Sequence, residues 1–175
     1  MKNITKLVVT LVIGGTVYSV SQSDIATNFS KETGLTQQQA EQYIENIPED
    51  ELASFDEIGA ELVTVGQDIL DSTAEIDCLT YYYEWETNTL DCQSGKAQLN
   101  RIGNSHIALG RSYQILDTED ASEEDIYTVI QNIDRLNRDY DLEIVSLFLD
   151  PVDITETKQT NLYNKALLQA AVESK

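Results

Sequence analysis

The side chains that could do chemistry are few, and they lack the partners that most metal or cofactor sites need. The chain contains one histidine, His106, two cysteines, Cys78 and Cys92, and no methionine beyond Met1. A closed zinc site, a carboxylate-bridged pair of metals and a His/Met haem site would each need more ligands of these types. We therefore predict no metal site and no cofactor. His106 should have a structural role in or near a helical core, although it could still join carboxylates in a looser site.

Carboxylates are abundant, but their spacing does not predict a specific site. The acidic run 117–125 is similar to a calcium-binding loop in composition only, because it lacks the central glycine and has Thr128 where such a loop needs a bidentate glutamate. Weak, non-specific cation binding there stays open. The chain also lacks the Gly-x-Ser-x-Gly, phosphate-loop and dinucleotide-binding glycine motifs. We predict no catalytic residues and expect that the protein is not an enzyme.

The net charge narrows the set of partners. The 175-residue chain has 31 acidic and 11 basic side chains, which gives a formal charge of −20 and a pI near 4.1. A field of this sign repels nucleic acid and anionic lipid and attracts cations. We therefore expect a protein partner with a basic surface, and no nucleic acid. Solubility of an exported or salt-exposed surface explains the acids better than a specific cation site does.

The first 21 residues have the composition of a secretory signal. Two lysines precede an apolar run from Leu7 to Tyr18, and small residues at 19–21 offer a cleavage site before Gln22. A transmembrane anchor needs ~20 apolar residues, so the run is short for one. We predict a signal peptide over residues 1–21, with an uncleaved anchor, and membrane attachment through it, as the alternative. The mature protein would then occupy a secreted, periplasmic or lumenal compartment.

If the protein is exported, its two cysteines are expected to form a disulfide. In an oxidising compartment two cysteines are usually paired, and neither lies in a Cys-x-x-Cys motif. We predict a disulfide between Cys78 and Cys92. In the chain-entropy description, such a bridge stabilises the fold by about 3 kcal/mol.

An aromatic cluster between the cysteines is the best candidate for an interaction site. Consecutive residues of a helix point about 100° apart, so three tyrosines in a row cannot all face the core. Tyrosine and tryptophan also anchor many protein interfaces. The alternative is that these rings only cover the open end of a helical bundle. The predicted interaction tip comprises Tyr81, Tyr82, Tyr83, Glu84, Trp85 and Glu86.

The remaining sequence predicts an all-helical domain over residues 36–175, after a linker at 22–35. No sustained β-type alternation is evident in the apolar pattern. Apolar residues instead recur every three or four positions, and capping boxes at Thr36 and Ser122 mark helix starts. The expected helices run from Thr36 to Asn46, from Pro48 to about Thr80, from Ser94 or Lys96 to Leu116, from Ser122 to about Leu149, and from Thr155 to Glu173. A kink at Asp139-Tyr140-Asp141 is the alternative for the fourth of them.

Four glycines inside the helices predicted at 48–80 and 94–116 call for a packing explanation. Gly59 and Gly66 are seven residues apart on one helix, and Gly103 and Gly110 are seven apart on the next. A glycine inside a helix costs about 1 kcal/mol relative to alanine. Glycines two turns apart leave a flat strip on which a second helix can lie closely. Exposed, merely tolerated glycines are the alternative, and that alternative is stronger for Gly103 and Gly110.

Together these observations predict an antiparallel up-and-down bundle of four to five helices behind an N-terminal signal segment. The expected function is that of an exported, acidic, non-enzymatic interaction or accessory subunit. A small-ligand or cation-binding bundle is the alternative.

Overall fold

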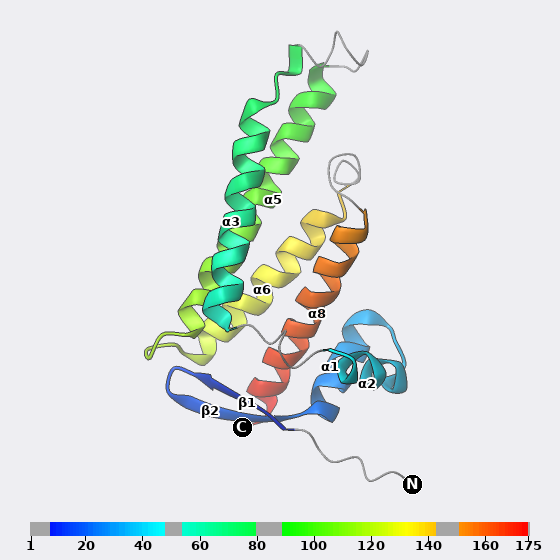
Figure 1. Ribbon diagram of the computed structural model, residues 1–175, viewed down its shortest axis with the longest axis vertical. Helices are drawn as coiled ribbons and strands as arrows, with labels where there is room; N and C mark the ends of the chain where they lie inside the picture. The colour runs from blue at the N-terminus through cyan, green and yellow to red at the C-terminus, as the bar shows by residue number, and fades with distance from the viewer. Residues whose placement is uncertain (1–7, 48–53, 80–88, 143–150, 175) are drawn as a thin grey trace.

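The structure is mostly helical, with a small sheet at the N-terminus (Figure 1). This computed structural model describes residues 8–47, 54–79, 89–142 and 151–174. The predicted helical class is confirmed, whereas a bundle of four to five helices is not, because the described residues form six helices and two strands. The elements are β1 (Val8–Ile13), β2 (Thr16–Ser21), α1 (Gln22–Thr33), α2 (Gln37–Glu45), α3 (Phe55–Glu75), α5 (Thr89–Leu116), α6 (Glu123–Tyr140) and α8 (Pro151–Glu173).

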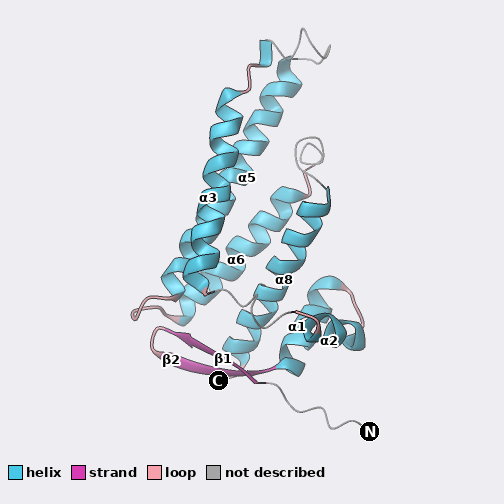
Figure 2. Cartoon of the chain, viewed as in Figure 1, coloured by secondary structure: helices cyan, strands magenta, loops and turns pink. Residues whose placement is uncertain are grey.

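Residues 8–21 form an antiparallel β-hairpin, so the expectation of no β-structure is wrong (Figure 2). The register pairs Ile13 with Thr16 and continues regularly to the other end of the strands. Gly14 and Gly15 form the turn with φ of 55° and 70°. Two-residue hairpin turns require this left-handed conformation, which glycine adopts without steric cost.

The hairpin belongs to the hydrophobic core, and a signal segment is not confirmed. Ile13, Tyr18 and Val20 are buried, and β2 packs on α1 and α8. A segment that is removed after export would leave these core positions empty. The predicted signal peptide over residues 1–21 therefore stays a prediction, and residues 8–21 of it form this packed hairpin.

Residues 22–33 form helix α1 in place of the predicted linker. The Ser21 hydroxyl caps its start by accepting the backbone N–H of Asp24 at 3.2 Å, and Gly34 ends it. Ile25, Ala26 and Phe29 are buried, a stripe too short to stand out in the sequence. The next helix, α2, is confirmed together with its capping box between Thr36 and Gln39.

Helices α3 and α5 form the predicted antiparallel pair. A capping box between Ser54 and Glu57 starts α3, while the start predicted at Pro48 lies outside the described residues. Helix α5 begins at Thr89, earlier than predicted. Its predicted stripe is confirmed as core, since these residues are all buried: Leu99, Ile102, His106, Leu109, Tyr113 and Leu116.

The four helix glycines face one another across α3 and α5. A Cβ on Gly59 would lie 2.6 Å from the Gly110 carbonyl oxygen, and one on Gly110 would lie 2.5 Å from that of Gly59. Gly66 and Gly103 make the same reciprocal contact at 2.6 and 2.8 Å. Real Cβ atoms do not approach this closely, so the predicted close packing is confirmed for all four positions.

Helices α6 and α8 differ from their predicted bounds. Helix α6 ends at Tyr140 with Asp141 as its C-cap, so one continuous helix to Leu149 is wrong. The last helix begins at Pro151 and not at Thr155, because proline is well tolerated where no backbone N–H is needed. Its predicted end at Glu173 is confirmed.

Four long helices, α3, α5, α6 and α8, form a row in which each packs on the next (Figure 1). The order is α3 on α5, α5 on α6, and α6 on α8, and among the described residues α3 and α8 make no comparable contact. We call this the four-helix row. Helices α1 and α2 pack together at the α8 side, and the hairpin lies across the lower ends of the helices. The row therefore has an open side between α3 and α8.

Candidate binding groove

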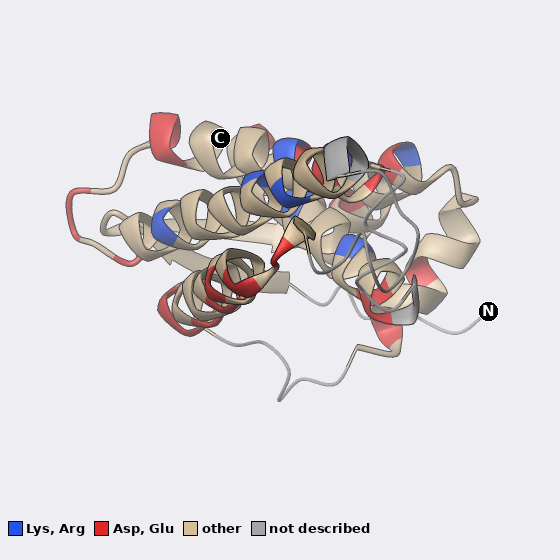
Figure 3. Ribbon diagram, turned by 90° about the horizontal axis from the view of Figure 1, so that it is seen from above, with Lys and Arg blue, Asp and Glu red and all other residues tan. Residues whose placement is uncertain are grey.

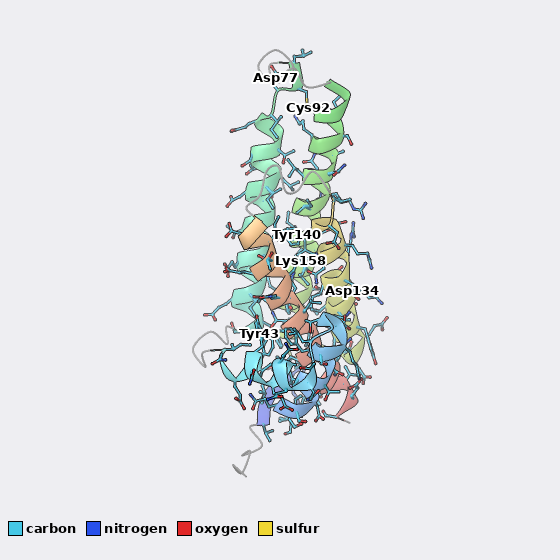
Figure 4. The ribbon with its side chains drawn as sticks, turned by 90° about the vertical axis from the view of Figure 1, so that its right-hand side faces the viewer. Tyr43, Asp77, Cys92, Asp134, Tyr140 and Lys158 are labelled. Carbon is cyan, nitrogen blue, oxygen red and sulfur yellow. A yellow bond between two sulfur atoms is a disulfide. The ribbon has the colours of Figure 1, made fainter. Side chains whose placement is uncertain are left out.

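The predicted interaction tip cannot be placed, whereas the disulfide beside it can. Residues 81–86 lie outside the described residues, so the tip stays a prediction. Cys78 and Cys92 form the predicted disulfide, with their Cα atoms 5.6 Å apart. Figure 4 labels Cys92 at the end of α5 farthest from the hairpin. The disulfide thus joins the first turn of α5 to the residues that follow α3. It lies at the end of the α3–α5 pair that extends past α6 (Figure 1).

A groove with a volume of about 680 Å³ lies on the open side of the four-helix row. It lies between β1, α2, α3 and α8, and its volume falls in the range of about 300–1,000 Å³ typical of ligand pockets. We call it the groove. Its apolar lining comprises Val9, Leu11, Val12, Ile47, Phe55, Ile58, Leu62, Val65 and Leu167.

The groove exists because α3 has a wider apolar stripe than its one main neighbour covers. The glycine strip of α3 packs on α5, and the side chains of Ile58 and Leu62 remain half-buried beside it. Val65 is 38% exposed. In a closed bundle these side chains would contact a helix on the other side. Here they face open space opposite α8.

The polar floor of the groove is a hydrogen-bonded pair from α5 and α6. The Tyr140 hydroxyl lies 2.5 Å from Nε2 of His106, and Nδ1 of His106 lies 3.0 Å from the Ile102 carbonyl oxygen. A carbonyl only accepts, so Nδ1 carries the proton and Nε2 accepts from the tyrosine. The two rings meet edge to face, with centroids 5.4 Å apart. Both side chains line the groove, and Figure 4 places Tyr140 midway along the molecule.

Burial keeps this pair neutral. The His106 side chain is 1% exposed, and burial lowers its pKa below the ordinary 6.5, although the contact with the Ile102 carbonyl opposes the shift. Burial also raises the pKa of Tyr140 above its ordinary value. The predicted structural role of His106 therefore has a geometric basis, because both ring nitrogens are used within the fold.

Ser105, which precedes His106 in the chain, and Asp139 of α6 form no catalytic triad with this histidine. The Ser105 hydroxyl donates to Oδ2 of Asp139 at 2.6 Å, and Arg101 pairs with Oδ1 of Asp139 at 2.7 Å. A triad needs the histidine to bond both the serine and the carboxylate. His106 instead bonds Ile102 and Tyr140. This buried network joins α5 to α6 and offers no nucleophile–base pair.

A second charged cluster fixes α8 against its neighbours. Lys165 lies 2.8 Å from Glu32 of α1 and 2.6 Å from Asp134 of α6. Burial lowers the pKa of Lys165, but its hydrogen bonds to Asp134 and Glu32 outweigh burial and leave that pKa above the ordinary 10.5. The cluster sets the position of the wall that α8 contributes to the groove.

The charged side chains of the groove have one sign. Among the described lining residues, Glu61, Asp117 and Glu156 are acidic and none is a lysine or arginine. The sequence of α3 likewise contains acids and no bases. Figure 3 shows the acidic residues in red and the basic residues in blue along the helices. The groove therefore favours a neutral or cationic occupant.

Comparisons with protein-family models, with curated proteins and with solved structures found no match. Among the described residues, no cluster of three or more histidine, cysteine or acidic side chains has the geometry to hold a metal ion. No helix in the described ranges is long and apolar enough to cross a membrane.

Sequence reasoning missed the groove, although two signals pointed to it. Gly14-Gly15 between two runs of β-branched residues is a strong hairpin signal, which the signal-peptide interpretation obscured. The stripe of α3 also extends to Ile58 and Val65, which is wider than one packing partner can cover. The position of Tyr140 opposite His106 follows from how α6 packs on α5 and has no local sequence signal.

Proposed function

We propose that the protein is a non-enzymatic interaction protein of an oxidising, extracytoplasmic compartment, and that it binds a segment of a partner protein in the groove. The observation that carries the proposal is the apolar surface left open between α3 and α8. Concave apolar surfaces with a polar rim are typical of binding sites. The disulfide supports the compartment, since such bonds persist in oxidising surroundings.

The acidic rim specifies the chemistry of the partner. Glu61 and Glu156 come from the two facing helices, and Asp117 lies at the end of the groove where α3 begins. A partner segment with apolar side chains in its centre and lysine or arginine beside them would complement this surface. Attraction of this kind should weaken as salt rises, because exposed charges are screened.

The test is a titration of the protein with two fluorescent peptides of equal charge, both rich in lysine and apolar residues. One peptide is designed to be helical and the other extended. We expect saturable binding of at least one peptide, weakened at least about tenfold by Val65→Arg, which adds bulk and a repelling charge inside the groove. Tyr127→Arg is the matched control, because Tyr127 is 48% exposed on α6 and does not line the groove.

Equal loss of binding in both variants would show a general charge effect and would contradict a groove site. Failure of both peptides to bind would contradict the proposed function. The tip at residues 81–86 stays a second candidate contact, and binding that only Tyr82→Ala and Trp85→Ala abolish would favour it.

A small apolar ligand is the second candidate, supported by the volume of the groove and by its polar floor. A molecule with an apolar body and one polar group could place that group at Asn161 or Asn164, which also line the groove. Mass spectrometry of the protein under non-denaturing conditions checks this possibility. A bound small molecule that Val65→Arg displaces would favour it over a partner segment.

A further inference from the structure

The free edge of β1 forms one side of the groove. The groove is lined by four consecutive residues of this strand, Val9, Thr10, Leu11 and Val12, and by none from β2. Successive side chains of a strand point to opposite faces of the sheet. Four consecutive residues can line the same groove only if the groove meets the strand along its edge.

The backbone groups on that edge are unpaired within the described residues. In a two-residue hairpin the residues beside the turn exchange both hydrogen bonds, so Ile13 and Thr16 form a hydrogen-bonded pair. The pairing alternates along the ladder, and Val8, Thr10 and Val12 therefore direct their N–H and C=O groups away from β2. Among the residues that the structure describes, these strands make backbone hydrogen bonds only with each other. Three residues of β1 thus offer donors and acceptors in register.

The described hairpin has no charged residue, proline or bulge of the kind that usually blocks pairing at a strand edge. Natural edge strands are protected by charged residues, proline, bulges or a covering element. From Leu7 to Ser21 the sequence contains no charged residue and no proline, and the register has no bulge. Val8 and Val12 are 52% and 59% exposed. The chain has a net charge of −20, so a stretch of 15 residues without any charge differs from the rest of the sequence.

We infer that the groove binds an extended segment of a partner protein, which adds to β1 as a third strand. This inference rests on the proposed function and specifies the conformation of the partner. Main-chain hydrogen bonds to β1 would supply affinity, and pockets for alternate side chains would supply specificity, as in other cases of strand addition. One face of the added strand would contact Phe55, Ile58 and Leu62 of α3.

Charge and length define the occupant further. A β-strand rises about 3.3 Å per residue, so the edge of β1 accommodates a segment of about six residues. Asp117 and Glu61 line the groove near the start of α3, and a lysine or arginine of the segment would pair with them. The segment is therefore β-branched in its centre and basic at one or both ends.

The test uses the full-length chain and a panel of fluorescent seven-residue peptides. Each peptide has lysine at both ends and alternating valine and threonine between them. Thr10→Pro removes one outward N–H without touching the β1–β2 ladder, because proline is tolerated at an edge position that does not donate to a neighbouring strand. Ser19→Pro is the matched control, since Ser19 is the cross-strand partner of Thr10 and faces the opposite edge.

We expect at least one peptide to bind, with an affinity that falls about tenfold in Thr10→Pro and stays unchanged in Ser19→Pro. A second arm N-methylates the peptide and leaves the protein unchanged. Alternate amides of an added strand point toward β1 and away from it, so methylation of the first set should abolish binding and methylation of the second set should not. This arm keeps the test decisive if a proline variant unfolds, which circular dichroism reports.

Several outcomes would overturn the inference. No binding by any extended peptide, or binding that survives N-methylation of each of the two sets of amides, excludes strand addition. Binding of the helical peptide alone would leave the proposed function intact and overturn only the extended conformation. A dimer of the unliganded chain in sedimentation, broken by Thr10→Pro, would assign the edge to a second copy of the protein and likewise contradict a partner segment.

Discussion

At the scale of single residues, the sequence predicted the core position of His106 but not its hydrogen-bond partner Tyr140. The spacing of α5 places His106 on the core face, and the structure confirms it there. The hydrogen bond between the Tyr140 hydroxyl and Nε2 gives this side chain a neutral, satisfied state. In a protonated His106, Nε2 would carry a hydrogen and could no longer accept the hydrogen bond from the Tyr140 hydroxyl.

Acid should destabilise the protein through His106, and His106→Gln should reduce that effect. Burial lowers the pKa of His106 in the folded state, so the unfolded chain binds the proton more readily. Its contribution to stability is complete above the unfolded value of 6.5 and is lost as pH falls through that value toward the lower folded pKa. Thermal unfolding between about pH 7.5 and about pH 5.5 measures this, in a window above the titration of most carboxylates. The same decrease in melting temperature with pH in the wild type and in His106→Gln would contradict a contribution from His106.

At the scale of elements, regular periodicity predicted the helices well and the irregular boundaries poorly. The stripe of α5 and the capping boxes of α2 and α6 were predictable, because they depend on residues within one or two turns. Helix α1 was missed because its apolar stripe is short, and the end of α6 was missed because apolar spacing continues past Tyr140. The glycine strip was predictable as a pattern, and only the structure shows which glycine faces which.

Gly110→Ala should destabilise the protein, which is the opposite of the usual effect of alanine in a helix. An isolated glycine replaced by alanine would gain about 1 kcal/mol. Here the new Cβ would lie 2.5 Å from the Gly59 carbonyl oxygen, and overpacking of this kind costs about 1–3 kcal/mol. Denaturant unfolding checks the sign. Asn104→Ala, on the exposed side of α5, is the control and should be neutral or slightly stabilising. A stabilising Gly110→Ala would refute the close approach.

At the scale of the whole molecule, the N-terminal hairpin changes the organisation that the sequence predicts. Short, β-branched apolar runs are typical both of signal segments and of buried strands, and composition alone does not separate them. The distinction lies in the two glycines and in long-range contacts with α1 and α8. The groove was unpredictable for the same reason, since it depends on which helices stay apart.

Deletion of residues 1–21 should unfold the protein or nearly so. The deletion removes Ile13, Tyr18 and Val20 from the core, a loss of roughly 5 kcal/mol of apolar burial against a typical total stability of about 5–15 kcal/mol. Circular dichroism and thermal unfolding of residues 22–175 measure this. Val20→Ser should reproduce part of the loss, whereas Val17→Ser should not, because Val17 is 62% exposed. A truncated chain as stable as the full chain would contradict this expectation and would agree with a cleaved signal peptide.

The central claim is that the groove between β1, α3 and α8 binds a basic segment of a partner. Amide chemical-shift mapping tests it most directly, with the full-length protein labelled with ¹⁵N and titrated with the lysine-flanked peptides. We predict saturable shifts concentrated at Thr10 and Val12 of β1 and at Ile58, Leu62 and Val65 of α3, with Tyr127 of α6 unaffected. Shifts confined to the end of the α3–α5 pair beside the disulfide, or scattered over the acidic surface without saturation, would contradict the claim.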